Sequence, residues 1–291
     1  MHSFYSSLMW HHWHHFANTI LTQRFFNTNI RRNFMKKLML IRRSWLAVCT
    51  VLFSAVFFSS CMKSNDNNQE TPVAGIIAFN LAPQQSAVGF QLSGNNLTNT
   101  ALSYTNYTGG YLGIYTGARS VTAFDANTNS IIASTDYTFE KDKYYSLFLV
   151  GDTTFQNVIV NDKIDSLSGN NGKAYIRYIN AIADASTPAV NISEEGNSLI
   201  SDNAAFKSVS EFVAATPGAV TISINNNDNV QAQRTITLEA RKVYTALLLG
   251  VPGSTDSLKS VQIRYIENGT LSSDTTDQGF SSVNPSSVKI N

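Results

Sequence analysis

The stretch TFEKDKYYSLFLVG (residues 138–151) is echoed by TLEARKVYTALLLG (residues 237–250). The two segments share Thr, Glu, Lys, Tyr and Gly at the same internal positions, and their apolar residues also match. In each segment a polar turn precedes an apolar run, which is typical of a β-strand entered from a turn. The echo therefore indicates that one structural unit occurs twice.

Two further blocks repeat in the same order at a spacing of about 100 residues. AYIRYINAI (174–182) answers GIIAFNLAP (75–83), and FVAATPGAVTISI (212–224) answers YLGIYTGARSVTAF (111–124), with Gly117 opposite Gly218. A polar linker, SLSGNNG (166–172), separates the two series. The chain is an internal duplication.

Each unit contains short apolar or alternating runs separated by Asn, Gly, Asp and Ser, and we expect these runs to be strands. In the first unit they are GIIAFNL, VGFQL, GGYLGIY, SVTAF, SIIAS, YYSLFLV and NVIV. About seven strands in about 100 residues is the pattern of an immunoglobulin-like β-sandwich. The predicted fold is all-β, with two tandem immunoglobulin-like β-sandwich domains.

Two tyrosines have the spacing of a tyrosine corner, in which a hydroxyl bonds back to the backbone between strands E and F. Phe139 lies six residues before Tyr145, Leu238 lies six before Tyr244, and each pair brackets a polar turn. We interpret Tyr145 and Tyr244 as structural residues.

AYIRYINAIADASTPAVNIS (174–193), VAATPGAVTISI and TLEARKVYTALLLG together resemble the repeat of the domain-of-unknown-function 4397 family, which occurs in tandem in exported bacterial proteins. The second repeat matches better than the first, where Ala78 stands in place of Arg177. The resemblance covers residues 74–268. It implies a β-sandwich and an envelope location, and it brings no catalytic residues.

The segment upstream of Cys61 has the features of a bacterial export signal. Met35-Lys36-Lys37 and Arg42-Arg43 precede an apolar run, SWLAVCTVLFSAVFF (44–58), which is shorter than the roughly 20 residues of a spanning helix. The run ends in FSSC (58–61), which resembles a lipoprotein cleavage site, although Phe58 stands where Leu is usual. We therefore expect lipid on Cys61, and the Asn-rich tether that follows resembles envelope lipoproteins of Bacteroidota.

Residues 1–34 precede this signal, so we interpret Met35 as the true start. A metal site in HHWHH (11–15) is the alternative for that segment, because closely spaced imidazoles are good ligands. The expected segments are an upstream extension (1–34), a signal peptide (35–60), a lipidated tether (61–72), sandwich repeats (73–166 and 173–268) and a polar tail (269–291).

The distribution of reactive residues restricts the chemistry of the mature chain. Every His and Trp, and both Cys, lie at or before Cys61. Ser-His-Asp and Cys-His catalysis are therefore excluded after that point. Carboxylate chemistry remains an alternative, with Glu194, Glu195, Asp184 and Asp125 as candidates. No cofactor or metal is expected, although oxygen-rich NNNDN (225–229) leaves calcium as an alternative.

The charge balance argues against a nucleic-acid partner. After the cleavage site, 14 Lys and Arg face 20 Asp and Glu, which gives a net charge of about −6, whereas phosphate binding needs a basic footprint. The expected partners are the membrane, through the lipid anchor, and a glycan or an envelope protein.

The repeats differ in YTNYTGGYLGIY (104–115). Tyr111 aligns with Phe212 and is expected in the core, whereas Tyr104, Tyr107 and Tyr115 are candidates for an aromatic binding platform, with packing along a strand face as the alternative. Asp-Ser/Thr sequences also resemble the Bacteroidota O-glycosylation pattern, at Thr153, Ser166, Ser257 and Thr275.

The sequence thus favours a non-catalytic, lipid-anchored outer-membrane protein that serves as a binding, adhesion or scaffold module. A glycan-binding accessory lipoprotein of a polysaccharide-uptake system and a carboxylate-dependent hydrolase are the alternatives.

Overall fold

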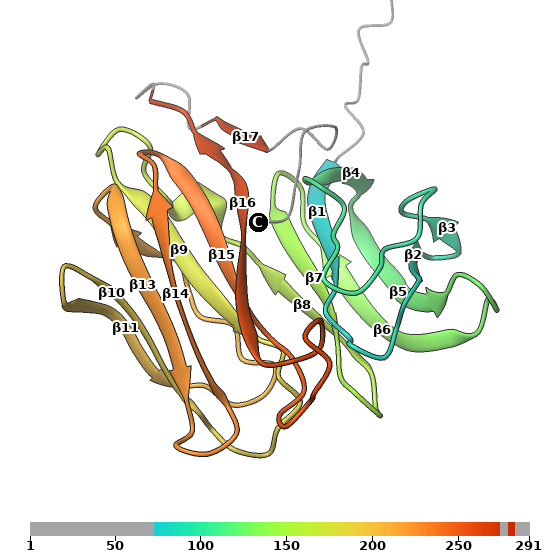
Figure 1. The fold of residues 1–291 in the computed structure, drawn as a ribbon. Coiled ribbons are helices and arrows are strands. Elements are labelled where there is room, and N and C mark those ends of the chain that lie inside the picture. Colours follow the sequence, from blue (N-terminus) through green and yellow to red (C-terminus); the bar gives the residue numbers. More distant parts are fainter. Residues whose placement is uncertain (1–72, 274–278, 283–291) are drawn as a thin grey trace, which may run out of the picture. The chain divides into compact units, whose positions relative to one another are not determined.

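The computed structural model describes residues 73–273 and 279–282 (Figure 1). The expectations for the signal peptide, the tether, Cys61, HHWHH and Thr275 lie outside these residues. No helix in the described part of the chain has the length and apolar character needed to cross a membrane.

The first repeat is an eight-stranded sandwich. Its outer sheet has the order β3-β2-β5-β6, and its inner sheet has the order β4-β1-β7-β8. The strands are β1 (Val73–Asn80), β2 (Val88–Leu92), β3 (Asn95–Asn96), β4 (Leu112–Tyr115), β5 (Gly117–Asp125), β6 (Ile131–Phe139), β7 (Tyr144–Val150) and β8 (Gln156–Asn161).

The second repeat has the same strand order, because its outer sheet is β11-β10-β13-β14 and its inner sheet is β12-β9-β15-β16-β17. The strands are β9 (Ala174–Asn180), β10 (Ala189–Glu194), β11 (Asn197–Asn203), β12 (Val213–Ala215), β13 (Gly218–Asn225), β14 (Gln231–Leu238), β15 (Lys242–Leu249), β16 (Gln262–Leu271) and β17 (Phe280–Ser282). A short 3₁₀ turn, η1 (Ile164–Ser166), precedes β9.

The prediction of an all-β fold with two tandem sandwiches is confirmed. Within each sandwich the first strand runs parallel to the seventh, so β1 pairs with β7 and β9 with β15. Both repeats contain two four-stranded sheets, and β17 extends one of them in the second repeat. A constant-type immunoglobulin domain instead has seven strands, in one sheet of four and one of three.

Gly117 and Gly218 occupy the first positions of β5 and β13, as the sequence alignment expects. Their φ angles are 101° and 145°, a region that residues with a Cβ rarely adopt. The glycine is thus repeated because both repeats have a positive φ angle at this position.

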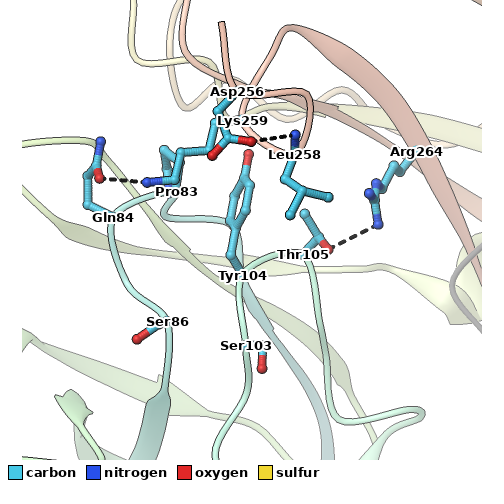
Figure 2. Close-up of a pocket in the computed structure, with 10 residues that line it drawn as sticks. All are labelled: Pro83, Gln84, Ser86, Ser103, Tyr104, Thr105, Asp256, Leu258, Lys259 and Arg264. Atoms are coloured by element: carbon cyan, nitrogen blue, oxygen red, sulfur yellow. Dashed lines mark hydrogen bonds between the residues drawn. The ribbon is translucent and has the colours of Figure 1, made fainter. Parts of the chain in front are cut away.

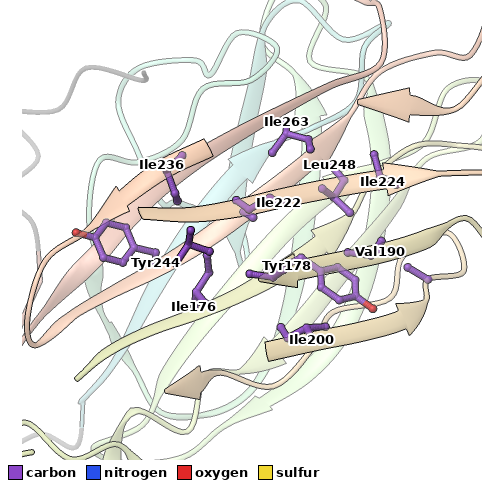
Figure 3. Packing of buried hydrophobic residues seen from close by; sticks show 14 of the residues in the cluster. Ile176, Tyr178, Val190, Ile200, Ile222, Ile224, Ile236, Tyr244, Leu248 and Ile263 are labelled. Carbon is purple, nitrogen blue, oxygen red and sulfur yellow. The ribbon is translucent and has the colours of Figure 1, made fainter. Parts of the chain in front are cut away.

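Each sandwich has its own core between its two sheets. Figure 3 shows the second core, where Ile176 and Tyr178 of β9 meet Ile222 of β13. Successive strand residues point to opposite faces, so alternate residues of the inner strands leave this core and point away from it.

These remaining residues form a third cluster, which joins the two repeats. It contains Ile77, Phe79 and Phe148 from the first inner sheet together with Ile179 and Leu247 from the second. The inner strands are consequently buried on both faces, which explains why they read as continuous apolar runs in the sequence. The two sandwiches pack inner sheet against inner sheet.

The strand register corrects the alignment of Arg177 with Ala78. Ile77 pairs with Ser146, and Arg177 pairs with Thr245, the counterpart of Ser146. The structural counterpart of Arg177 is therefore Ile77, one position away. The sequence alignment applied one spacing between the repeats to both the first and the seventh strand. The chain between these two strands is one residue longer in the first repeat than in the second, so the correct spacing changes by one.

The structure also shows the bonds made by the two repeated tyrosines. The backbone N–H of Glu140 donates to Tyr145 Oη at 3.0 Å, and that of Glu239 donates to Tyr244 Oη at 3.1 Å. The turns join β6 to β7 and β14 to β15, so the corner lies between the sixth and seventh strands rather than between E and F.

Part of the stretch expected as a polar tail is ordered into the second inner sheet. β16 extends to Leu271, and β17 pairs with it. Phe280 packs edge-on against Tyr111 and Tyr144 of the first repeat, with ring centroids 5.6 Å and 5.0 Å apart. In the sequence, the indication of β17 is that Phe280 is an aromatic residue within a polar stretch.

Candidate functional site

A cavity of about 410 Å³ lies where the two repeats meet. One wall comes from the first repeat and includes Tyr104 and Thr105, which lie between β3 and β4. The other wall comes from the second repeat and includes Lys259, in the loop before β16, and Arg264, near the start of that strand. Figure 2 shows the full lining: Pro83, Gln84, Ser86, Ser103, Tyr104, Thr105, Asp256, Leu258, Lys259 and Arg264.

A buried asparagine holds the loop that presents Tyr104. Asn80 Nδ2 donates to the carbonyl of Leu102 at 2.9 Å, and the N–H of Thr105 donates to the carbonyl of Asn80 at 2.8 Å. Asn180 holds the corresponding loop of the second repeat in the same way, through Ala204 and Lys207. Because these bonds correspond, Tyr104 is the counterpart of Phe206, and Thr105 is the counterpart of Lys207.

The cationic residues bridge the repeats through neutral partners. Lys259 Nζ donates to Gln84 Oε1 at 3.0 Å, and Arg264 Nη1 donates to Thr105 Oγ1 at 3.1 Å. Figure 2 draws Tyr104 between these two contacts. The cavity is thus held on both sides by hydrogen bonds from the second repeat to the first.

Tyr104 carries a polar atom whose bonding capacity is unused. Its hydroxyl is buried and has no hydrogen-bond partner among the described residues. Burial raises the pKa of Tyr104 to about 12, against the opposing effect of Arg264, so the hydroxyl remains a donor at neutral pH. A buried hydroxyl without a partner costs about 1–3 kcal/mol.

The opposite end of the interface has apolar residues at the positions of Tyr104 and Arg264, while its cation, Lys207, donates to Gln156 of the first repeat at 2.8 Å. Equivalent register positions make Val158 the counterpart of Arg264, because Phe148 pairs with Val158 and Leu247 pairs with Arg264. Val158 and Phe206 both pack against the cluster that joins the repeats. The interface has approximate two-fold symmetry, which is broken where Tyr104 and Arg264 stand opposite Phe206 and Val158.

The middle of the interface contains a buried ion pair. Arg177 Nη1 lies 2.8 Å from Asp162 Oδ1, and both side chains are almost inaccessible, at 3% and 0% exposure. Arg177 also donates to Ser146 Oγ at 2.8 Å and to Thr245 Oγ1 at 3.1 Å, and its guanidinium lies over the ring of Phe212.

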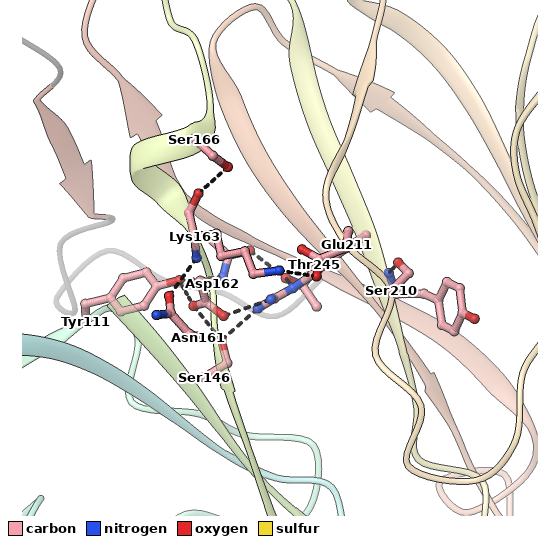
Figure 4. A network of polar contacts seen from close by, with 12 residues as sticks. Tyr111, Ser146, Asn161, Asp162, Lys163, Ser166, Ser210, Glu211 and Thr245 are labelled. Carbon is pink, nitrogen blue, oxygen red and sulfur yellow. Dashed lines mark hydrogen bonds and ion pairs between the residues drawn. The ribbon is translucent and has the colours of Figure 1, made fainter. Parts of the chain in front are cut away.

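Tyr111 extends this network, which Figure 4 shows. Its hydroxyl donates to Asp162 Oδ2 and accepts from Asn268 Nδ2 at 3.2 Å, and Thr245 Oγ1 donates to Asn268 Oδ1 at 2.7 Å. Burial, followed by the charge of Asp162, raises the pKa of Tyr111 well above its ordinary value. Residues from both repeats therefore satisfy one another, which fixes the two walls of the cavity relative to each other.

The three tyrosines expected to form one aromatic platform do not line a common cavity. Tyr107 is buried and stacks on Phe79, with ring centroids 5.2 Å apart. Tyr115 is 64% exposed and lines a separate cavity of about 550 Å³ beside β3 and β4, together with Arg119. The chain between these tyrosines is not one strand, so the structure distributes them over different surfaces.

The candidate carboxylates are used in local structure. Glu194 accepts from the N–H of Thr216 at 2.7 Å, Asp125 from the N–H of Asn127 at 2.8 Å, and Asp184 from the hydroxyl of Ser186 at 2.9 Å. Glu195 occupies a turn with φ of 47°. None of these four residues lines either of the two cavities described above.

In the NNNDN loop, side-chain oxygens accept hydrogen bonds from the loop's own backbone. Asn225 Oδ1 accepts from the N–H of Asn227 at 2.6 Å, and Asn226 Oδ1 accepts from the N–H groups of Asp228 and Val230. These oxygens therefore stabilise the turn between β13 and β14.

Three of the proposed O-glycosylation residues, Thr153, Ser166 and Ser257, are exposed. Ser166 Oγ donates to the carbonyl of Lys163 at 2.7 Å within η1.

Sequence reasoning missed Lys259 and Arg264. Both lie outside the repeated blocks, and their importance depends on contact with a loop about 160 residues earlier. A signal was present in principle, since Arg264 interrupts the apolar side of QIRYI where the first repeat has Val158 in NVIV.

The fold and the cavity define a tandem β-sandwich protein with a cleft between its repeats. The chain belongs to the family described as Domain of unknown function (DUF4397), whose model matches residues 74–193 and 174–277. The family resemblance seen in the sequence is thereby confirmed. No curated protein matches the sequence.

Solved structures with a detectable likeness are distant. A family 26 carbohydrate-binding module of Eubacterium rectale Amy13K, in complex with maltoheptaose, is 10% identical with a TM-score of 0.21, and the match covers 62% of this chain and 94% of that chain. A candidate cell adhesion protein of Bacteroides eggerthii is 12% identical with a TM-score of 0.22, covering 68% and 96%. Such weak similarity carries no information on the ligand of this chain.

Proposed function

We propose that the protein is a non-catalytic binding protein of the cell envelope and that the cleft between its sandwiches holds the ligand. The observation that carries this proposal is the broken symmetry of the interface. At one end Phe206 and Val158 pack against the apolar cluster between the repeats, whereas at the other end the corresponding Tyr104 and Arg264 line a cavity. Packing of this cluster alone does not require a tyrosine and an arginine at these two positions.

The non-catalytic part of the proposal rests on residue types and their use. The mature segment contains no His, and its carboxylate candidates make hydrogen bonds within turns. A two-carboxylate mechanism needs a pair facing one cleft. The cleft contains one carboxylate, Asp256.

A ligand screen by thermal unfolding tests the binding function, because a ligand that binds the folded state raises the unfolding temperature. We expect hits that are lost in Tyr104→Ala and retained in Tyr115→Ala, which changes the separate cavity. Ligands whose stabilising effect is lost in Tyr115→Ala and retained in Tyr104→Ala would show that the binding site is not the cleft.

We further propose that lipid on Cys61 holds the protein on the outer membrane. The charged segment, the short apolar run and FSSC support this anchor, and each buried methylene of an acyl chain contributes about 0.8 kcal/mol. Metabolic labelling with a palmitate analogue should mark the wild type and leave Cys61→Ser unmarked and released from membranes. A labelled Cys61→Ser would exclude this anchor.

A glycan is the second candidate for the ligand class. The observation that favours it is the combination of the Tyr104 ring with the hydroxyls of Ser86, Ser103 and Thr105 in one cavity. A glycan array tests it, with Tyr104→Ala expected to abolish retention. Background signal throughout the array would exclude a glycan as the ligand. The thermal-unfolding screen would then be needed to identify another ligand or an envelope protein partner.

O-glycosylation remains a separate proposal. Intact-mass measurement of protein from its native source should show added hexose-containing mass that decreases when Thr153, Ser166, Ser257 and Thr275 are replaced by Ala. An unmodified mass would exclude it.

A further inference from the structure

The charge of the cleft differs in sign from that of the protein around it. The described residues carry 12 Lys and Arg against 16 Asp and Glu, so this part of the protein is acidic. The cleft contains two cations, Lys259 and Arg264, and one carboxylate, Asp256. A local positive field in an acidic protein attracts an anion to this position.

Neither cation of the cleft is neutralised within the described residues. Lys259 contacts the amide oxygen of Gln84, and Arg264 donates to Thr105 and, at 2.9 Å through Nε, to Gln262. No ion pair is formed between either cation and a described carboxylate. Arg264 therefore keeps guanidinium N–H groups available for a planar anion.

The carboxylate of Asp256 is engaged in its own turn. Its Oδ1 accepts from the N–H of Leu258 at 2.9 Å, and its carbonyl accepts from the N–H groups of Lys259 and Ser260. Asp256 is exposed, whereas Arg264 is half-buried. Its negative charge is therefore better screened by solvent than the positive charge of Arg264.

The Tyr104 ring lines the same cavity, while its hydroxyl is buried. Figure 2 draws the contacts of Lys259 and Arg264 on opposite sides of Tyr104, so a small anionic group contacts one of the two cations. The planar, half-buried guanidinium of Arg264 suits a carboxylate. Leu258, Pro83 and the Tyr104 ring supply apolar surface for the body of the ligand.

We infer that the cleft binds a small molecule through a single carboxylate, with a ring-sized body such as that of a sugar acid. Arg264 binds the carboxylate, and Lys259, on the other side of Tyr104, adds to the positive field of the cleft. This inference rests on the proposed function and names the chemical group that the site recognises.

Isothermal titration of the purified full-length protein with four probes tests this inference: galacturonate, galactose, acetate and inorganic phosphate. We expect galacturonate to bind roughly tenfold or more tightly than galactose, since a hydrogen bond to a charged group contributes more than one between neutral groups. Acetate binding would show that the carboxylate alone is recognised, and weaker acetate than galacturonate binding would show that the body also contributes. The affinity should fall with added salt.

Arg264→Gln should weaken galacturonate binding about tenfold, and Lys259→Gln should weaken it less, whereas Tyr104→Phe, which keeps the ring, should leave it nearly unchanged. Lys207→Gln is the matched control, because Lys207 is a cation at the opposite end of the interface, where it donates to Gln156 at 2.8 Å. It should leave affinity unchanged. Circular dichroism and unfolding temperature establish that each variant is folded.

Equal binding of galactose and galacturonate would overturn the carboxylate inference while the binding function stands. Preferential binding of phosphate, or no effect of Arg264→Gln in a folded protein, would overturn it as well. If none of the four probes binds, the inference fails, and the thermal screen decides separately whether the cleft binds another ligand.

Discussion

At the residue scale, the ion pair between Arg177 and Asp162 is the most consequential interaction of the interface. Its groups are removed from water, which is unfavourable for each charge alone and is offset by the bonds to Ser146, Thr245 and Tyr111. The first repeat has Ile77 at the position of Arg177, so the network is built from different residues of the two repeats. It specifies how one repeat meets the other.

Replacing Arg177 with Met should destabilise the protein by about 3–5 kcal/mol, because Asp162 would remain buried without its cation. Urea unfolding measures this loss. The double variant Arg177→Met with Asp162→Leu should lose less than the sum of the single variants, since no uncompensated charge remains. Additive losses would show that the two groups do not interact.

Replacing Tyr145 with Phe should cost about 1 kcal/mol, the typical net contribution of one hydrogen bond. The ring would still pack in the core of the first sandwich, and only the bond from Glu140 would be lost. Urea unfolding again provides the measurement, and ligand affinity should remain as in the wild type. A loss of affinity without a loss of stability would assign Tyr145 to the binding site instead.

Residue spacing was sufficient to find Tyr145 and Tyr244, because both bonds of the corner are local in sequence. Tyr104 was identified as a candidate, but its partners were not. Lys259 and Arg264 reach the cleft only through the packing of two sheets, and no local pattern encodes that contact.

At the element scale, the inner strands have sequences that serve two cores. β1 reads VAGIIAFN and is buried along nearly its whole length, with alternate residues facing its own sandwich and the other repeat. β7, β9 and β15 also have continuous apolar runs and are buried along nearly their whole length. The strands were therefore predictable, and so in principle was their burial on both faces, whereas β3, with only two exposed residues, gave no apolar signal.

Replacing Phe79 with Ala tests this double burial. Phe79 is fully buried and stacks on Phe148 and Tyr107 in the cluster between the repeats. We expect a loss of about 3–5 kcal/mol in urea unfolding, as for other buried aromatic truncations. Ile131→Ala on β6 is the control, because Ile131 is 72% exposed and its loss should change stability by less than about 0.5 kcal/mol.

At the scale of the whole molecule, the duplication produces an interface with approximate two-fold symmetry and then breaks it. The repeats could be recognised from their matched blocks. Their packing could not, because it depends on which faces of two separately folded sheets meet. The two ends of that junction differ where Tyr104 and Arg264 stand in place of Phe206 and Val158.

Stability should fall at alkaline pH. Burial raises the pKa values of Tyr104, Tyr107 and Tyr178 to about 12, from 10.0. The unfolded chain then loses these protons at lower pH than the folded chain, so their stabilising contribution is complete below pH 10 and disappears between pH 10 and about 12. Urea unfolding at several pH values, with tyrosinate absorbance followed in parallel, should show both changes together; constant stability across this range would contradict the raised pKa values.

The central structural claim is that the two repeats form one unit and thereby create the cleft. Differential scanning calorimetry tests it most directly, because a single cooperative unit unfolds with equal calorimetric and van't Hoff enthalpies. We predict one transition for the wild type. Two transitions at separate temperatures, each with about half of the total enthalpy, would show that the sandwiches unfold independently and would contradict a cleft fixed between them.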